Sequence, residues 1–451
     1  MTRYELTQTP LARAMFKSRW PQLALQLGLL AGLALVITAG LLGTPVGNRN
    51  FGIVMVWIAW WAALMLVAVP WLGRAWCSVC PLPLPGEWLQ RGAILGPRGR
   101  GLGLNLRWPR RLRGLWVQNA AFVAVAVLSL PVLTQPRWTG FLLLGLVLAA
   151  VALSVIFERR AFCRYVCPVG GFIGLYAQVA PVEVRVRDAA LCAGHTVKTC
   201  YTGSADGYGC PWNVFPGTLQ ANTYCGLCME CLRTCPYDNV AINLRPIGAD
   251  LNRSGLRGLD EAFKAIVLLG SGLAYSAVLL GSWSEARSAA AAVGSRAWLV
   301  FALGFLSFVV VLIPAAFLIA VRLGLWWSRS RAASLQALRA LSPALIPLGL
   351  SVWVAFSLSF LLANLSYVGP VLSDPLNLGW NLLGTAGVGW SPYGQSLFPW
   401  LTIGVLVVGL AWSSQRLGAI ADELRVGGRL ALPPQVVSLG LTIAVLWVLV
   451  G

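Results

Sequence analysis

Histidine occurs only once in the 451 residues of this sequence, at position 195. A b-type haem held between membrane helices commonly takes two axial histidines, and a c-type haem is attached at a C-x-x-C-H motif. The sequence has neither a second histidine nor that motif. We therefore expect the protein to carry no haem.

Charged residues are also scarce, at 11% of the chain, whereas soluble domains carry about 25%. Hydrophobic residues make up 58%, and the mean hydropathy is +0.73. The net charge of +19 does not indicate a nucleic-acid partner, because the arginines flank long apolar runs, as the positive-inside rule predicts for membrane proteins. The composition indicates a multi-pass membrane protein with no nucleic acid as its partner.

Nine apolar runs are each long enough to cross a membrane as a helix. They lie at 22–43, 51–72, 114–134, 138–158, 262–282, 297–321, 343–366, 397–413 and 433–450. The first is too long for a signal peptide and lacks a clear cleavage site, so we expect it to be retained. Arginine-rich loops at 91–113 and 322–339 predict that the N-terminus and the cysteine-rich region are cytoplasmic, in a bacterial inner membrane.

Cysteine is absent after residue 235, and all eleven cysteines lie between residues 77 and 235. Clustered spacing of this kind favours a metal site over disulfide bonds, which need an oxidising compartment. The run CGLCMECLRTCP has the C-x₂-C-x₂-C-x₃-C-P spacing of bacterial [4Fe–4S] ferredoxins, in which the fourth cysteine ligates the other cluster. Its members are Cys225, Cys228, Cys231 and Cys235. A zinc or disulfide knuckle is the alternative.

Two further cysteine pairs lie at the expected cytoplasmic ends of the second and fourth apolar runs. They are Cys77 and Cys80 in GRAWCSVCP, and Cys163 and Cys167 in FCRYVCPVG. Because each pair precedes a proline at a helix end, the two pairs can meet and supply four thiolates to one metal site. The alternative is a dithiol pair or a zinc site.

The remaining cysteines form an irregular group upstream of the ferredoxin run. Cys210 precedes a proline, as a fourth-ligand cysteine does, while Cys192 is followed at the expected ligand position by His195 rather than by cysteine. Eleven cysteines and one histidine make twelve ligands, which is three sets of four. The sets are Cys77, Cys80, Cys163 and Cys167; Cys210, Cys225, Cys228 and Cys231; and Cys192, His195, Cys200 and Cys235. Alternatively, His195 is a loop residue and the third set has three cysteines.

Together, GRAWCSVCP, ERRAFCRYVCPVGGF and CGLCMECLRTCP resemble the motifs of the NapH/NosR-type membrane polyferredoxins, over about residues 50–245. The resemblance implies quinol oxidation and delivery of electrons to a partner enzyme through [4Fe–4S] clusters. Three features depart from the family pattern: the Cys77 motif is one residue shorter, the first ferredoxin half uses His195, and the last five helices have no counterpart. Glu87 and Glu158 flank the cysteine motifs and are candidate proton acceptors; ordinary interfacial carboxylates are the alternative.

Common organic-cofactor fingerprints are missing. No G-x-G-x-x-G follows an expected strand, the stretch at 99–103 lacks a strand–helix context, and there is no flavin or molybdopterin motif. Chemistry on a substrate other than quinone is therefore expected in another chain.

The sequence as a whole predicts an all-α polytopic membrane protein of about nine helices with an inserted, cytoplasmic ferredoxin-like domain. The expected domains are a four-helix membrane region at 1–160, the iron–sulfur domain at 161–258 and a five-helix membrane region at 259–451. We expect two [4Fe–4S] clusters, with a third at the Cys77 group, in an electron-transfer subunit of the quinol dehydrogenase type that works with quinone and other redox subunits. The alternatives are a redox-active assembly or regulatory protein for a metalloenzyme, and a membrane anchor.

Overall fold

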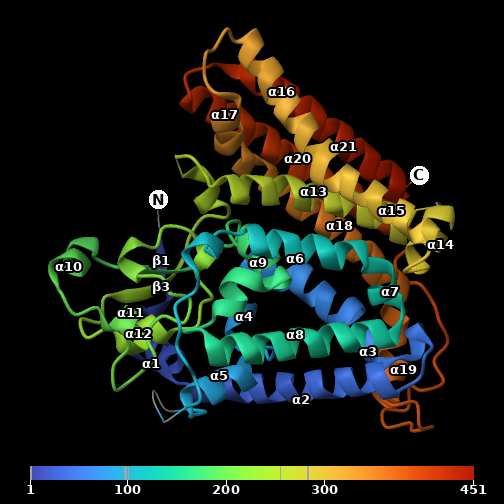
Figure 1. The fold of residues 1–451 in the computed structure, drawn as a ribbon, viewed down its shortest axis with the longest axis horizontal. Coiled ribbons are helices and arrows are strands. Elements are labelled where there is room, and N and C mark those ends of the chain that lie inside the picture. Colours follow the sequence, from blue (N-terminus) through green and yellow to red (C-terminus); the bar gives the residue numbers. More distant parts are fainter. Residues whose placement is uncertain (1–2, 96–98, 100, 254, 282–283, 451) are drawn as a thin grey trace. The chain divides into compact units, whose positions relative to one another are not determined.

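The computed structural model describes residues 3–95, 99, 101–253, 255–281 and 284–450. Within these residues, eight helical segments are long and apolar enough to cross a membrane. They are Trp20–Leu42, Phe51–Leu72, Pro136–Ile156, Leu259–Leu279, Arg296–Trp327, Ser334–Ser373, Phe398–Glu423 and Gly428–Val450. The chain is thus a helical membrane protein, as expected, and a small ferredoxin-like part is inserted between its helices (Figure 1).

The apolar run at 114–134 is not one helix. It forms α6 (Trp116–Val127) and α7 (Ser129–Thr134), which are separated at Leu128. Pro131 explains the break, because its nitrogen cannot donate to the carbonyl of Val127 and its ring would collide with that carbonyl.

The eighth apolar run is longer than the 397–413 expected from hydropathy, because α20 (Phe398–Glu423) continues through the polar stretch after residue 413. Its last turns bury Leu417, Ile420 and Ala421. These three positions share one helix face, so the helix remains packed where its average hydropathy falls.

The chain folds into two compact units. Unit 1 contains Met1–Leu35, Val67–Ala121 and Leu142–Asn252, and unit 2 contains Val36–Leu66, Phe122–Phe141 and Arg253–Gly451. These units are interleaved along the sequence, and the domain boundaries at 160 and 258 stay predictions. All eleven cysteines belong to unit 1.

Unit 2 is a helical bundle around α13 (Leu259–Leu279), most of which is buried. This helix packs with α16 (Ile313–Trp327), α18 (Ile346–Asn364) and α21 (Leu432–Val450), and α20 packs against α18 and α21 (Figure 1). The indole of Trp353 lies at its aromatic centre, donating to the carbonyl of Leu268 at 2.9 Å.

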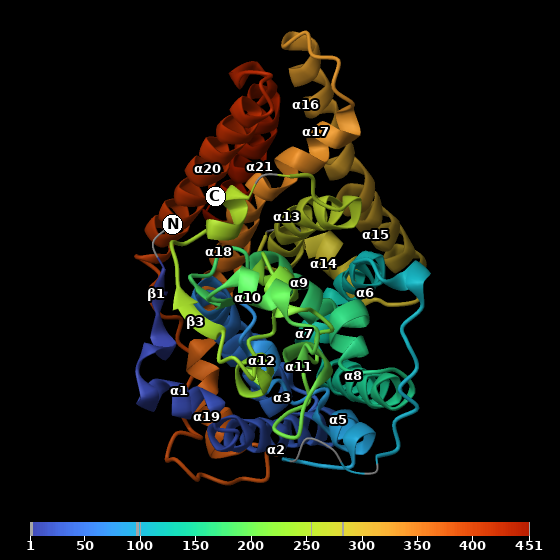
Figure 2. The same ribbon diagram turned by 90° about the vertical axis from the view of Figure 1, so that its left-hand side faces the viewer.

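Unit 1 contains a three-stranded antiparallel sheet in the order β1-β3-β2. The strands are β1 (Tyr4–Glu5), β2 (Val182–Val186) and β3 (Val240–Leu244). Val184 pairs with Ile242, and both side chains are buried beneath the ferredoxin run. Figure 2 shows β1 beside β3, with α1 (Pro10–Lys17) below it. The N-terminal strand was not expected from sequence.

Candidate iron–sulfur sites

The ferredoxin run folds as a loop that contains Cys225 and Cys228, followed by the short helix α12 (Glu230–Thr234), which carries Cys231. The backbone is left-handed at Leu227 (φ 50°) and Met229 (φ 63°), on either side of Cys228. Left-handed residues other than glycine are uncommon and gather at functional sites. The two turns let successive cysteines face one cavity.

That cavity has about 390 Å³ of empty space, including its mouth, and four thiols line it: those of Cys210, Cys225, Cys228 and Cys231. These four cysteines are the second ligand set expected from sequence. The other lining residues are mostly apolar, among them Val184, Val214 and Leu219. Four cysteine thiolates are the usual ligand set of a [4Fe–4S] cluster, so the lining fits that group.

Burial is the main influence on these thiols. Burial, together with nearby thiols of the same set, raises the pKa of Cys228 to about 12 and the pKa of Cys231 well above 9. The free thiols are therefore protonated at neutral pH, and metal binding must release protons. Within the described part of the chain, no three histidine, cysteine or acidic side chains converge as ligands of a single metal ion.

The two cysteine pairs at helix ends also come together. Cys77 lies in α4 (Trp76–Val79), which ends at Cys80; Cys163 lies in the helical turn Phe162–Val166. Cys167 caps α9 (Pro168–Tyr176), and its Sγ accepts from the backbone nitrogen of Gly170 at 3.2 Å. The proline after Cys167 starts this helix, a position where its missing N–H costs nothing.

The two pairs lie close enough for their thiols to affect one another's pKa. Burial raises the pKa of Cys80, and the thiols of Cys77 and Cys167 raise it further. The pKa of Cys163 is likewise raised by burial and by the other three thiols, although Arg160 opposes the rise. The structure thus brings together the first ligand set expected from sequence.

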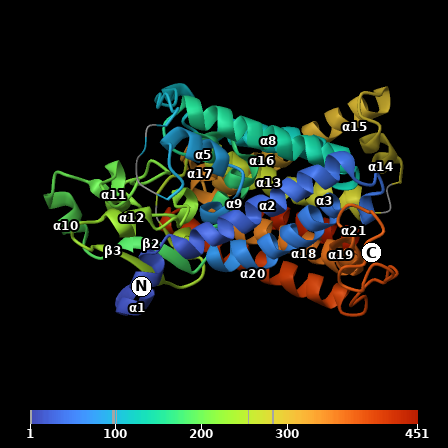
Figure 3. The ribbon, with the colours of Figure 1, turned by 90° about the horizontal axis from the view of Figure 1, so that it is seen from below.

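The third group contains three thiols, and Figure 3 shows the elements that carry it at one end of unit 1. Cys192 lies in α10 (Ala189–Gly194) and Cys200 in α11 (Thr199–Thr202), while Cys235 ends α12. The pKa of Cys200 is raised to about 11, mainly by burial and to a smaller extent by the neighbouring thiols of Cys235 and Cys192. Asn239 links the other two, donating from its side chain to Cys192 Sγ at 3.2 Å and from its backbone to Cys235 Sγ at 3.3 Å.

His195 follows α10, and its ring packs 4.9 Å from that of Tyr237. Its Nδ1 lies 2.9 Å from the carbonyl oxygen of Val197. A carbonyl only accepts, so Nδ1 carries the proton and Nε2 is left as the nitrogen with a free lone pair. Metal-binding histidines commonly make this backbone contact. Ligation by His195 stays a prediction.

Two buried arginines connect the first and second cysteine groups. Arg160 donates to the carbonyl of Cys77. Burial lowers the pKa of its guanidinium, but Glu87 and, to a smaller extent, Cys163 and Cys228 raise it above its ordinary value. Arg74 donates to the carbonyl of Cys163 at 3.3 Å and to that of Thr223. From sequence, the basic residues near the cysteines were assigned mainly to membrane topology; their contacts with cysteine carbonyls were not foreseen.

Glycines in α9 make room for Arg74. A Cβ at Gly174 would lie 2.8 Å from Arg74 Nη1, and one at Gly170 would lie 3.4 Å from Nη2. The PVGGFIG sequence that follows Cys167 is therefore explained by a guanidinium packed against the helix.

The two candidate proton acceptors differ in environment. Glu87 is buried and forms ion pairs with Arg160 (Nη2–Oε2, 3.2 Å) and Arg91 (3.5 Å). Burial alone would raise the pKa of Glu87, but Arg160 and Arg91 hold it below its ordinary value, so the carboxylate is anionic at neutral pH. Glu158 is half-buried and accepts from Asn213 at 3.4 Å. The proton-acceptor role of both residues stays a prediction.

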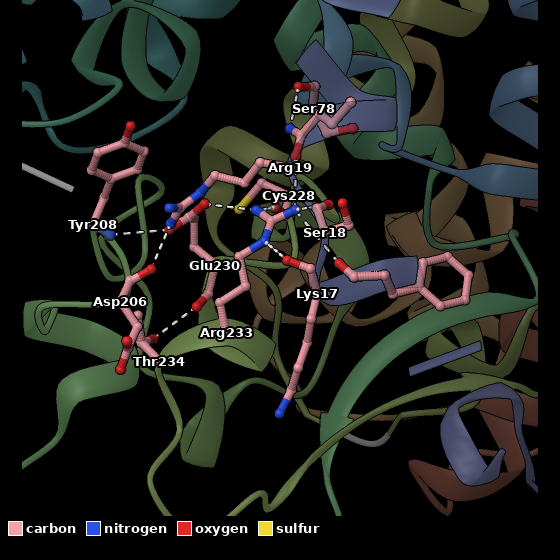
Figure 4. A network of polar contacts seen from close by, with 12 residues as sticks. Lys17, Ser18, Arg19, Ser78, Asp206, Tyr208, Cys228, Glu230, Arg233 and Thr234 are labelled. Carbon is pink, nitrogen blue, oxygen red and sulfur yellow. Dashed lines mark hydrogen bonds and ion pairs between the residues drawn. The ribbon is translucent and has the colours of Figure 1, made fainter. Parts of the chain in front are cut away.

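The start of the chain is tied to the ferredoxin run through Arg233 (Figure 4). Its guanidinium donates to the carbonyls of Cys228 at 3.1 Å, Lys17 at 2.9 Å and Ser18 at 3.0 Å. It also pairs with Glu230 at 2.7 Å. A second anchor lies close by, because Gln22 and Gln26 of α2 (Trp20–Leu42) both donate to the carbonyl of Ser78 at 2.9 Å. Residues 17–26 thus contact both the ferredoxin run, through Arg233, and the Cys77–Cys80 turn, through Ser78.

Comparison with known proteins supports an iron–sulfur assignment. Residues 53–114 and 139–186 match the family model of a 4Fe-4S binding domain. The matched ranges include Cys77, Cys80, Cys163 and Cys167 and end before the ferredoxin run.

Two curated proteins are similar to part of the chain. The methylamine utilization ferredoxin-type protein MauN of Paracoccus denitrificans is 31% identical over 144 residues, which is 28% of this chain and 48% of that protein. The putative electron transport protein YccM of Escherichia coli is 25% identical over 138 residues, which is 30% of this chain and 35% of that protein. The chain thus spans about half or less of each relative. No solved structure matches it.

Proposed function

We propose that this chain is an integral membrane electron-transfer subunit of the NapH/NosR type, which passes electrons between the quinone pool and a partner redox enzyme. Bound [4Fe–4S] clusters supply one-electron transfer. The observation that carries the proposal is the grouping of all eleven cysteines into three sets within unit 1. The 4Fe-4S domain match over the Cys77 group and the similarity to two ferredoxin-type and electron transport proteins support it.

The protein residues have distinct roles in this proposal. The first set of thiolates and the Cys210–Cys231 set would each hold one cluster, and Cys192, Cys200 and Cys235 with His195 Nε2 would hold a third. Arg74 and Arg160 place buried positive charge at both of the first two sets. Positive charge stabilises added negative charge, so Arg74 favours the reduced state of the neighbouring sites, whereas Glu87 offsets the charge of Arg160.

We also propose a membrane orientation and a place for quinone. The cysteine-bearing unit would face the cytoplasm of a bacterial inner membrane, with quinone bound near the helix ends. Glu158 is the better candidate of the two carboxylates for accepting a proton, because Glu87 is held as an anion by two arginines.

The decisive measurement is iron and acid-labile sulfide per chain in anaerobically purified protein, with EPR before and after addition of a reduced quinol analogue. We expect about twelve irons, four per cluster, and EPR signals that grow with quinol. The double variant C77S/C163S is expected to lose about four irons, and the neighbouring S78A is the matched control that should keep them.

Other outcomes would separate the alternatives. About eight irons in the native protein would indicate that the Cys77 group is a dithiol pair or a zinc site rather than a cluster site. Clusters that dithionite reduces but quinol does not would favour a partner-fed assembly or regulatory protein. Co-purification of a catalytic chain that requires the C-terminal helices would support an anchor role.

A further inference from the structure

Trp212 follows Cys210 and Pro211, and its side chain is only 1% exposed. It is one of the largest fully buried side chains in the described part of the chain. Its indole Nε1 makes no hydrogen bond to any described residue. An indole N–H is a donor only, and leaving such a donor buried without an acceptor is costly and rare.

The position of this nitrogen is defined from two sides. A Cβ at Gly226 would lie 2.0 Å from Trp212 Nε1, so the N–H edge rests directly on the loop between Cys225 and Cys228. The guanidinium of Arg74 covers the ring, 4.1 Å from its centroid. Trp212 also lines the same cavity as the thiols of Cys210, Cys225, Cys228 and Cys231.

Trp108 and Trp353, the two other tryptophans with buried side chains in the described part of the chain, have an acceptor, whereas the indole nitrogen of the partly buried Trp298 has no described acceptor and belongs to unit 2, which contains none of the cysteines. Trp108 donates to the carbonyl of Leu112 at 2.9 Å, and Trp353 donates to that of Leu268 at the same distance. Both have a protein acceptor that satisfies the N–H. Trp212 instead lines the cavity of the four thiols. The expected occupant of this cavity is a cluster that contains sulfide as well as thiolate sulfur. Sulfur accepts hydrogen bonds from N–H groups.

We propose that Trp212 Nε1 donates a hydrogen bond to a sulfur of the cluster bound by Cys210, Cys225, Cys228 and Cys231, and thereby raises the reduction potential of that cluster. Reduction adds negative charge to the acceptor, so the hydrogen bond is stronger in the reduced state. Trp212 is a positioning and tuning residue. The inference rests on the proposed iron–sulfur site but not on quinone as a substrate.

The first test is an EPR-monitored redox titration of the full-length W212F variant. Phenylalanine keeps an aromatic face for Arg74 but removes the N–H. We expect the ratio of reduced to oxidised cluster at a fixed potential to fall about tenfold, which is about 59 mV for one electron. Only one cluster should shift, and the iron content should be unchanged. The matched control is W108F, which removes another buried indole and should leave every cluster potential unchanged.

The second test is made on the wild-type protein, with W212F used only to assign the signal. Reduced wild-type protein labelled with ¹⁵N in the indole nitrogen should show a ¹⁵N coupling to a cluster by pulsed electron–nuclear double resonance, and W212F should lack it. Absence of the coupling in a wild-type protein that carries its full iron would overturn the role of Trp212 while leaving the iron–sulfur function intact. An unchanged potential in W212F would overturn it too. A native protein without iron at this site would overturn both proposals.

Discussion

At the scale of single residues, the Glu87–Arg160 pair shows how the site tolerates buried charge. Each side chain is 4% exposed, and Arg160 also donates to the carbonyl of Cys77. The carboxylate thus neutralises the arginine that lies between two groups of thiols. A buried ion pair costs desolvation free energy, but removing one partner costs more, because the other charge is then left alone.

The variant E87Q is therefore expected to lower the free energy of unfolding by about 3–5 kcal/mol. Glu423 is the control, because its pair with Arg416 spans 3.9 Å and its side chain is 47% exposed. E423Q should cost about 0–1 kcal/mol, as exposed pairs do. Thermal unfolding in detergent, followed by tryptophan fluorescence, compares the two. Equal losses would show that Glu87 is not the counter-charge of Arg160.

His195 gives a second prediction at this scale. If its Nε2 ligates iron, H195A should change the EPR signal or lower the iron content of one cluster only. H195C should restore the iron, with a lower potential at that cluster, because thiolate is anionic where imidazole is neutral. The readouts are iron content and an EPR-monitored redox titration. Identical spectra and potentials for the native protein and both variants would rule out ligation.

At the scale of elements, the loop between Cys225 and Cys228 depends on Gly226. Because a Cβ there would lie 2.0 Å from Trp212 Nε1, G226A should displace the loop or the indole. We expect about four irons per chain to be lost. Gly194 in α10 has open space where its Cβ would be, so G194A should retain the iron and serves as the control. Full iron in G226A would mean that the indole does not rest on this loop.

The edge strand β1 yields a prediction about pH. The carboxylate of Glu5 accepts a hydrogen bond from Arg187 Nε at 3.1 Å. Hydrogen bonding to Arg187 holds the pKa of Glu5 below its ordinary value of 4.5. A lowered pKa in the folded state contributes stability above pH 4.5 that is lost as the pH falls towards the folded value. Hydrogen exchange of residues 4–5 should therefore accelerate as the pH drops below about 4.5, after correction for intrinsic rates. E5Q should exchange faster at pH 6 and depend less on pH.

Much of this architecture can be predicted from sequence, but only where the signal is local. The long apolar runs are local, so most helices could be predicted. The cysteine spacings are local as well, and the three ligand sets drawn from them stay a prediction. Pairing of Tyr4 with Leu244 has no local signature, because two residues form the strand and its partner is far along the chain. The packing of Arg74 on Trp212 likewise joins distant segments, and an arginine near a membrane helix is explained equally well by topology.

At the scale of the whole molecule, the pairing of β1 with β3 constrains how many times the chain crosses the membrane between them. Strands β1 and β3 lie in one sheet, so the N-terminus and the ferredoxin-like part are on one side, and an even number of crossings must lie between them. Three long helices lie in this interval, Trp20–Leu42, Phe51–Leu72 and Pro136–Ile156. If each of these three helices crosses the membrane, we expect the broken segment of α6 and α7 to supply the fourth crossing. Its 19 residues, 116–134, would span about 28 Å as helix, close to the bilayer core.

Reporter fusions test this path. Fusions after residues 48 and 135 should report the periplasmic side, and a fusion near residue 105 the cytoplasmic side. Five more long helices follow residue 252, so a C-terminal fusion should be periplasmic. The fusion near residue 105 is the internal control for the fusions after residues 48 and 135. The same location for residues 105 and 135 would show that α6 and α7 do not cross, and would conflict with the β1–β3 pairing.

The same strand pairing sets an order of events during synthesis. Residue 240 leaves the ribosome long after residue 5, and at about 5–20 residues per second the delay is on the order of ten to fifty seconds. The N-terminal arm must stay unpaired on the membrane surface throughout, while Cys77, Cys80, Cys163 and Cys167 have already emerged. The helix-end thiols are thus available to iron delivery earlier than the ferredoxin-like sites, whose sheet is complete only when β3 has been made and the N-terminal strand pairs with it.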